Sequence, residues 1–297
     1  MKLRVALLNM MPDAALIVTE RQFAALLGAD SGRELELLRY TFSVLKRGPK
    51  VADHLQKHYR DATELRAEDC DVLVITGANV SDPSLPRQTF WQPLVEVLAW
   101  ALAADLPVLC SCLATHAVLE ARHRQTRVPI TPKVWGVFSH RSVEPDHPLL
   151  RGLPAEVPVP HSRHNAVDEA QFAAAGYEIL LSNPEVGPHL AVEKQRGRWL
   201  LMQGHPEYET ISLLKEYKRE VGQWQTGQRP DFPVPPCGYL GDDALRMLAS
   251  YESLCLGLEA GVDGYPDFPE SEIAPTLANN WSAAAILAVA NWLDSLT

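Results

Sequence analysis

Hydrophobic and polar positions follow two different periods in the first 124 residues. Short apolar runs predict buried strands, and the segments between them repeat apolar residues at helical spacing. Strands are expected at residues 3–8, 34–41, 71–76 and 108–109, and helices at residues 18–27, 88–103 and from 113 onward. Residues 45–68 are charged and predict irregular structure with a short helix. Strand–helix alternation of this kind predicts an α/β fold with a doubly wound, mostly parallel sheet.

From residue 127 onward the pattern favours strands, so a partly antiparallel region is expected beside the parallel sheet. Its strands are expected at residues 134–140, 156–161, 178–181, 190–193 and 199–203. A helix to about residue 224 and a proline-rich coil follow. Two further helices are expected, at 241–258 and 279–296. We therefore divide the chain into a core, 1–225, and a C-terminal coil with helices, 226–297, that packs on the core.

The last expected helix is apolar over much of its surface. Packing on the sheet explains such a surface, and a homodimer interface is the alternative.

Cys112 stands where an apolar strand changes directly into a helical pattern. A cysteine at such a junction lies beside the first free N–H groups of the helix, which favour a thiolate and can hold an oxyanion. The small Ala114 lets the turn close. Cys110 ends the apolar run and is expected to be a core residue. This pattern is typical of a nucleophile elbow with sulfur in place of a hydroxyl.

A cysteine nucleophile needs a base and a group that orients the base. Gly204-His205-Pro206-Glu207 offers both at the end of another apolar strand. Taken alone, such a triplet is explained as well by a glutamate that caps a helix. Combined with the elbow cysteine, it predicts a site of Cys112, His205 and Glu207.

Composition and charge narrow the class of protein. The formal net charge of −10 argues against nucleic-acid binding and against an anionic membrane surface. The 5 cysteines are odd in number and lack CxxC spacing, so reduced thiols, no metal site and a cytoplasmic location are expected. Asn9, Pro12 and Asp13 interrupt the first apolar run, which predicts no signal peptide. No segment reads as a membrane span.

The chain resembles the homoserine O-acyltransferases of methionine biosynthesis, which have a class I glutamine-amidotransferase-like fold. The resemblance rests first on Ser111-Cys-Leu-Ala-Thr-His-Ala-Val-Leu119 and Gly204-His-Pro-Glu-Tyr208. It extends, in the same order along the chain, through Leu7–Pro12, Glu20–Phe23, Val74–Ala78, Arg124–Arg127, Lys133–Phe138, Pro160–Arg163, Asn280–Ser282 and Asn291–Leu293. Many short matches in order are more specific than any one of them.

The resemblance implies acyl transfer from acyl-CoA to the homoserine hydroxyl through an acyl-enzyme on Cys112. His205 would be the general base and Glu207 would orient it. The N–H of Leu113 and one from residues 77–81 would form the oxyanion hole. No bound cofactor is implied, because acyl-CoA is a co-substrate.

The resemblance also implies residues that bind substrate. Arg219 matches an arginine that binds the substrate carboxylate. Lys133 and Ser162 match positions that line the pocket, although a solvated lysine and a turn serine would look the same. The loop position that correlates with donor choice in the family, glycine with succinyl and glutamate with acetyl, corresponds to Ser81. Ser81 is small and uncharged and does not repel a succinyl carboxylate, so a succinyl donor is favoured over acetyl.

Three alternatives stay open. A glutamine amidotransferase-type amide hydrolase uses the same Cys-His-Glu logic, but its elbow typically has glycine where this chain has Cys110 and Ala114. An acyltransferase could act on a related hydroxy amino acid, because the chain is longer than the family pattern between Arg219 and Trp281. A non-enzymatic member of the fold is disfavoured by the intact site.

Overall fold

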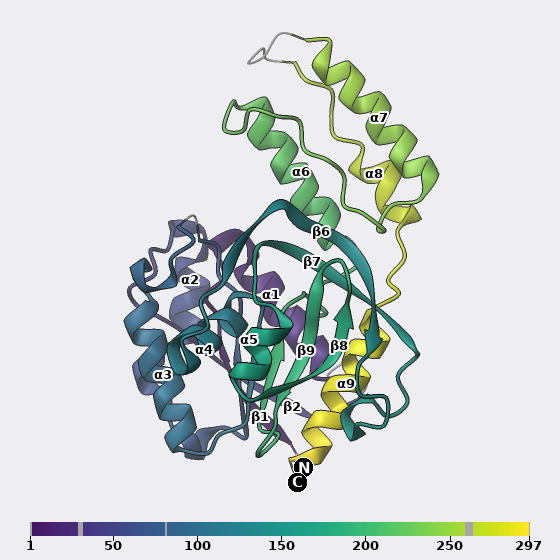
Figure 1. Cartoon of the computed structure of the whole chain (residues 1–297). Helices are drawn as coiled ribbons and strands as arrows, with labels where there is room; N and C mark the ends of the chain where they lie inside the picture. The colour runs from purple at the N-terminus through teal and green to yellow at the C-terminus, as the bar shows by residue number, and fades with distance from the viewer. Residues whose placement is uncertain (1, 29–31, 81, 259–263, 297) are drawn as a thin grey trace.

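The computed structural model describes residues 2–28, 32–80, 82–258 and 264–296, which fold around a 10-stranded sheet (Figure 1). The strands are β1 (Leu3–Leu8), β2 (Leu35–Thr41), β3 (Tyr59–Asp61), β4 (Val72–Ile75), β5 (Val108–Ser111), β6 (Val128–Ser142), β7 (Glu156–Ala166), β8 (Tyr177–Asn183), β9 (Gly187–Glu193) and β10 (Trp199–Met202). The helices are α1 (Asp13–Leu26), α2 (Pro49–His58), α3 (Trp91–Ala103), α4 (Leu113–His123), α5 (Glu169–Ala174), α6 (Ser212–Gln225), α7 (Asp242–Leu256), α8 (Glu270–Ile273) and α9 (Ser282–Ser295).

The sheet has a parallel part and an antiparallel part. Its strand order is β3-β2-β1-β4-β5-β10-β9-β8-β6-β7. Pairing is parallel from β3 to β10 and antiparallel from β10 to β7. The predicted α/β sheet with an antiparallel extension is therefore confirmed. β10 follows the antiparallel strands in sequence and returns beside β5, in the middle of the sheet.

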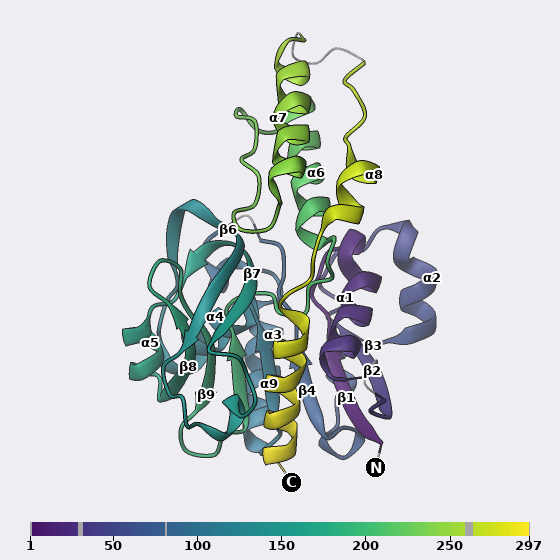
Figure 2. The same ribbon diagram turned by 90° about the vertical axis from the view of Figure 1, so that its right-hand side faces the viewer.

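Alternating side chains of the central strands build two apolar layers. In β1, Ala6 and Leu8 face α3 and α4, whereas Val5 and Leu7 face α1 and α9. Strands buried on both faces read as continuous apolar runs, which is why the sequence revealed them. Figure 2 shows α9 lying along the sheet near α1. Trp292 of α9 is fully buried there, so packing on the sheet explains the apolar surface of this helix.

A helical lobe of α6, α7 and α8 extends beyond the carboxyl edge of the parallel strands (Figures 1 and 2). Its helices share an apolar cluster that includes Tyr217, Leu248 and Ile273. A backbone bridge ties the lobe to β6, because Cys237 N donates to Trp135 O at 3.0 Å and Val137 N donates to Cys237 O at 2.8 Å. The division of the chain at residue 225 stays a prediction, and α6 before it shares its core with α7 after it.

One strand was not predicted from the sequence. Residues 45–68, expected to be irregular with a short helix, contain α2 and the edge strand β3. β3 has only 3 residues, too few to show the two-residue period of a strand. Its Tyr59 hydroxyl donates to Glu20 at 2.9 Å and accepts from Asn9 Nδ2 at 2.9 Å, so tertiary contacts hold it.

Candidate active site

Cys112 lies on a strained turn between β5 and α4. Its φ of 50° and ψ of −109° fall outside the regions that side-chain-bearing residues ordinarily adopt. The Cys112 N–H donates to Met202 O at 2.7 Å, and the Thr115 hydroxyl donates to Met202 O at 2.9 Å. β10 therefore holds the turn from beside it. Cys110 is fully buried in the core, and burial raises the pKa of its thiol.

His205 and Glu207 form a buried pair in the segment that follows β10. His205 Nδ1 lies 2.8 Å from Glu207 Oε1, and since the carboxylate accepts, Nδ1 is assigned the proton. The His205 N–H donates to Pro160 O at 2.7 Å. Glycine is required at 204, because a Cβ there would lie 2.6 Å from Val159 Cγ1. Parallel pairing of β10 with β5 brings this pair to Cys112.

The surroundings of His205 favour its protonated form. Burial alone lowers the pKa of His205, but the charges of Cys112 and Glu207 and hydrogen bonds to both raise it well above its usual value. The arrangement therefore favours the protonated imidazolium form of His205 beside Cys112.

Ser111 adds an orienting contact that the sequence analysis did not single out. Its hydroxyl donates to Glu207 Oε1 at 3.2 Å, so the same carboxylate oxygen accepts from Ser111 and from His205. Both residues are buried. Position 111 gave no signal in the sequence, because a serine at the end of a buried strand reads as a small core residue.

The space next to Cys112 is kept open by a glycine. A Cβ on Gly77 would lie 3.6 Å from Cys112 Cβ and 3.8 Å from Met11 Sδ, so the loop after β4 begins against Cys112. Leu113 is the first residue of α4, and its N–H has no partner within the helix. An oxyanion hole from Leu113 and this loop stays a prediction. Ser81, the expected donor-choice position, lies outside the described residues.

Ser162 and Arg219 meet at the carboxylate of Glu216. The Ser162 hydroxyl donates to Glu216 Oε2 at 2.6 Å, and Arg219 Nη2 lies 4.0 Å from the same oxygen. The Tyr208 hydroxyl donates to Glu216 Oε1 at 2.5 Å, and its ring stacks on His205 with centroids 4.5 Å apart. Glu216 was not singled out from the sequence, where its spacing from Arg219 was the available signal.

Lys133, on β6, pairs with Glu220, which lies one helical turn after Glu216 on α6. Its Nζ is 2.7 Å from Glu220 Oε1 and 3.6 Å from the ring centroid of Trp135. Arg229 pairs with the other oxygen of Glu220 at 2.7 Å. Burial favours the neutral form of Glu220, but Lys133 and Arg229 hold its pKa below the usual value. Lys133 is thus engaged in an ion pair, and a role in binding substrate stays a prediction.

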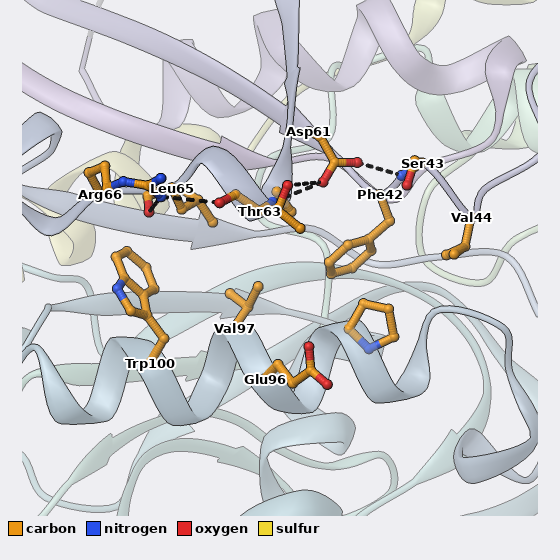
Figure 3. Close-up of a pocket in the computed structure, with 12 residues that line it drawn as sticks. Phe42, Ser43, Val44, Asp61, Thr63, Leu65, Arg66, Glu96, Val97 and Trp100 are labelled. Atoms are coloured by element: carbon orange, nitrogen blue, oxygen red, sulfur yellow. Dashed lines mark hydrogen bonds between the residues drawn. The ribbon is translucent and has the colours of Figure 1, made fainter.

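A separate pocket lies between α3 and the segment after β3 (Figure 3). It has a volume of about 350 Å³, and Phe42, Leu65, Val97 and Trp100 provide apolar walls. Its Asp61 carboxylate already accepts from Ser43 N and from Thr63. None of its lining residues belongs to the cysteine site, which we take as the candidate active site because it combines a strained cysteine with a histidine that a buried carboxylate orients.

Within residues 2–28, 32–80, 82–258 and 264–296, no cluster of histidine, cysteine and acidic residues could hold a metal ion. In the same part of the chain, no helix has the length and apolarity needed to cross a membrane.

Comparison with solved structures defines the class of fold. A glutamine amidotransferase from Methylobacillus flagellatus superposes with a TM-score of 0.56 at 13% identity, covering 100% of this chain and 95% of that one. A glutamine amidotransferase from Thermotoga maritima gives a TM-score of 0.53 at 12% identity, covering 88% and 96%. The fold is that of the class I glutamine amidotransferases, as predicted.

Sequence comparison identifies the family within that fold. The model of the homoserine O-succinyltransferase family matches residues 1–297. Homoserine O-succinyltransferases from Allochromatium vinosum and Thiobacillus denitrificans are 43% and 44% identical, each over 98% of this chain and 82% of the relative. The chain belongs to the homoserine O-succinyltransferase family. The resemblance drawn from the sequence motifs is confirmed.

Proposed function

We propose that this chain transfers a succinyl group from succinyl-CoA to the hydroxyl of homoserine, a step of methionine biosynthesis. Membership of the family supports the reaction and the donor. The observation that carries the mechanism is the strained Cys112 hydrogen-bonded to a His205 that Glu207 orients. No cofactor takes part, because the thioester of the donor is already activated.

The first half of the reaction forms an acyl-enzyme. The Cys112 thiolate attacks the thioester carbonyl carbon, and the N–H groups of Leu113 and of the loop beginning at Gly77 stabilise the oxyanion. The intermediate collapses with loss of the CoA thiolate, which takes the proton of the His205 imidazolium. Free CoA leaves, and a neutral His205 remains beside the new thioester.

The second half uses this neutral imidazole. Once Cys112 is acylated, its negative charge no longer raises the pKa of His205, and burial then favours the neutral form. His205 takes the proton of the homoserine hydroxyl as that oxygen attacks the acyl carbonyl. Cys112 leaves as a thiolate beside the imidazolium, which restores the resting pair.

Glu216 and Arg219 provide opposite charges for the amino acid. The Glu216 carboxylate suits the ammonium group, and the exposed Arg219 guanidinium suits the carboxylate. Ser162 and Tyr208 hold Glu216 in place, and the Tyr208 ring connects it to His205. Lys133 and the loop containing Ser81 complete the proposed substrate contacts. A cytoplasmic location is supported by five free cysteines, and a homodimer stays a prediction.

The test is intact-protein mass spectrometry after mixing with succinyl-CoA or acetyl-CoA. We expect a gain of one succinyl group, absent in Cys112→Ala, present in Cys110→Ala and discharged by homoserine. Glutamine hydrolysis without an adduct would support an amide hydrolase instead. An adduct that homoserine leaves in place would keep the acyltransferase and require another hydroxy amino acid as acceptor.

A further inference from the structure

Two arginines are buried without an acidic partner. Arg127 is 6% exposed and Arg163 is 4% exposed. Within the described residues, no carboxylate oxygen lies within 4.0 Å of either guanidinium. A buried charge is costly unless it is paired, and structures ordinarily provide the pair. Both arginines are therefore in surroundings that favour a bound anion.

Neutral acceptors fix the two side chains. Arg127 donates from Nε to Pro83 O at 2.9 Å and from Nη2 to Asp82 O at 3.4 Å. Arg163 donates to His161 Nδ1 at 3.3 Å, to the Asn165 carbonyl oxygen at 2.9 Å and to the Val186 carbonyl oxygen. A guanidinium has more N–H groups than these contacts use. Each side chain is thus pre-positioned, with donors left for a ligand.

A short chain of hydrogen bonds fixes the imidazole that Arg163 contacts. His140 Nδ1 donates to Phe138 O at 3.0 Å, so its Nε2 accepts from His161 Nε2 at 3.3 Å. His161 Nδ1 is then free to accept from Arg163 Nε. Burial lowers the pKa of His140 to about 4, which keeps it neutral. These imidazoles orient Arg163 without neutralising it.

Both arginines belong to segments that contact the reacting residues. Arg127 is anchored to Asp82 and Pro83, in the loop that begins with Gly77 against Cys112. Arg163 is on β7, close in sequence to Pro160, whose carbonyl accepts the His205 N–H. The two segments are adjacent, since Val128 pairs with Ala166.

A charge on Cys112 interacts favourably with both guanidinium groups. Burial lowers the pKa of Arg163 to about 10, and the Cys112 charge opposes that shift. Burial lowers the pKa of Arg127 too, opposed by Cys112, Glu120 and Asp82. Glu120, on α4, makes no hydrogen bond to Arg127 in the described structure. A negative charge on Cys112 therefore stabilises the charged form of both arginines.

We propose that Arg127 and Arg163 bind the free carboxylate of the succinyl group and thereby set the preference for a dicarboxylic acyl donor. This inference rests on the proposed acyl transfer. In the acyl-enzyme, the carboxylate lies two methylene groups beyond the carbonyl carbon on Cys112. Arginine donors match a carboxylate geometrically, and a donor without one leaves both guanidinium groups buried and unpaired.

The experiment measures acyl-enzyme formation without homoserine, by quenched-flow mass spectrometry of the full chain. The donors are succinyl-CoA, acetyl-CoA and butyryl-CoA, in which a methyl group replaces the carboxylate at the same chain length. The wild-type protein should react at least about a hundredfold faster, per unit concentration, with succinyl-CoA than with butyryl-CoA.

Arg127→Gln and Arg163→Gln should each reduce this preference at least about tenfold while keeping the butyryl-CoA rate. Arg163→Lys, which keeps the charge in case the glutamine variant does not fold, should retain an intermediate preference. Arg122→Gln is the matched control. Arg122 is a largely buried arginine of α4 that lies 3.8 Å from Glu193 and over the Trp199 ring, and the preference should not change.

Equal wild-type rates with succinyl-CoA and butyryl-CoA would overturn the inference and leave the acyl transfer intact. Equal losses with both donors in the arginine variants would assign the arginines a structural role only. An unchanged preference in Arg163→Lys and both glutamine variants would also overturn it. The absence of any adduct from all three donors would remove the proposed function itself.

Discussion

The phenol ring of Tyr208 lies against the imidazole of His205, with ring centroids 4.5 Å apart and planes inclined by 18°. The hydroxyl of the same ring donates to Glu216 at 2.5 Å. One rigid side chain therefore fixes the distance between His205, the proposed general base, and the carboxylate that we assign to the acceptor. Homoserine bound at Glu216 would be placed relative to His205 through this ring.

Replacing Glu216 by Gln should weaken use of homoserine and leave acylation unchanged. A hydrogen bond to a charged group is worth about 1.5–3 kcal/mol, so kcat/KM for homoserine should fall roughly 10- to 150-fold. Stopped-flow measurement of the two half-reactions separates the effects. Glu209→Gln is the control, because Glu209 pairs with the exposed Arg21. An equal loss of acylation rate would contradict the assignment.

Removing the Cys112 thiol should lower the pKa of His205. Burial favours neutral imidazole, and the Cys112 charge and hydrogen bond are among the interactions that overcome it. NMR titration of His205 in Cys112→Ala should show a lower pKa than in the wild-type protein. Acylating Cys112 should have the same effect. A His205 pKa that is the same in all three forms would contradict the proposed change of role between the half-reactions.

The free energy of unfolding should decrease as the pH falls below about 6.5. Burial lowers the pKa of His140 to about 4 and those of His161 and His189 well below their usual value. In that range the unfolded chain binds protons that the folded chain does not, so acid favours unfolding. Each histidine contributes a slope of about 1.4 kcal/mol per pH unit, and for His140 the slope ends near its folded pKa.

Urea unfolding between about pH 7 and about pH 5.5 measures this slope. A His140→Leu variant, which removes one protonation site, should show a shallower dependence even if it is less stable at neutral pH. A flat profile in the wild-type protein would mean that these histidines are protonated in the fold.

Replacing Gly136 by Ala should loosen the helical lobe from β6. A Cβ at this position would lie 2.1 Å from Cys237 O, and the φ of 137° is unfavourable for alanine. We expect a loss of about 1–3 kcal/mol in the free energy of unfolding and weaker binding of homoserine. Gly222→Ala is the matched control in α6, where nothing lies within 4 Å.

The control variant should be as stable as the wild-type protein or slightly more so, since alanine favours a helix over glycine. Calorimetry and steady-state kinetics on both variants make the comparison. Equal stability and equal kinetics of the two alanine variants would mean that the bridge at Gly136 contributes neither to the free energy of unfolding nor to homoserine binding.

The sequence predicted those parts of the fold that local patterns determine. β1, β4, β5 and β10 are buried on both faces and read as apolar runs, and the junction at Cys112 combined a strand end with a helix start. β3 was missed because the contacts of Tyr59 with Asn9 and Glu20 hold it, and these residues are far apart in the chain.

The candidate site divides in the same way. Cys112, His205 and Glu207 were predicted because each stands next to a strand end, and their roles stay predictions until tested. Arg127 and Arg163 belong to motifs of the family resemblance, but nothing in their spacing shows that they are buried or lack an acidic partner. That property depends on what surrounds them in three dimensions, which sequence patterns do not record.

The bridge at Gly136 joins two parts of the chain to which we assign different halves of the reaction. Cys112, His205 and Glu207, to which we assign acylation, lie near strand ends of the sheet, whereas Glu216 and Arg219 lie on α6 of the helical lobe. Substitutions that accumulate in the lobe can therefore change which hydroxy compound receives the acyl group and leave the thiol chemistry intact. Related enzymes could thus diverge in the acceptor they use through substitutions in the lobe, while the residues of the sheet that select the acyl donor stay the same.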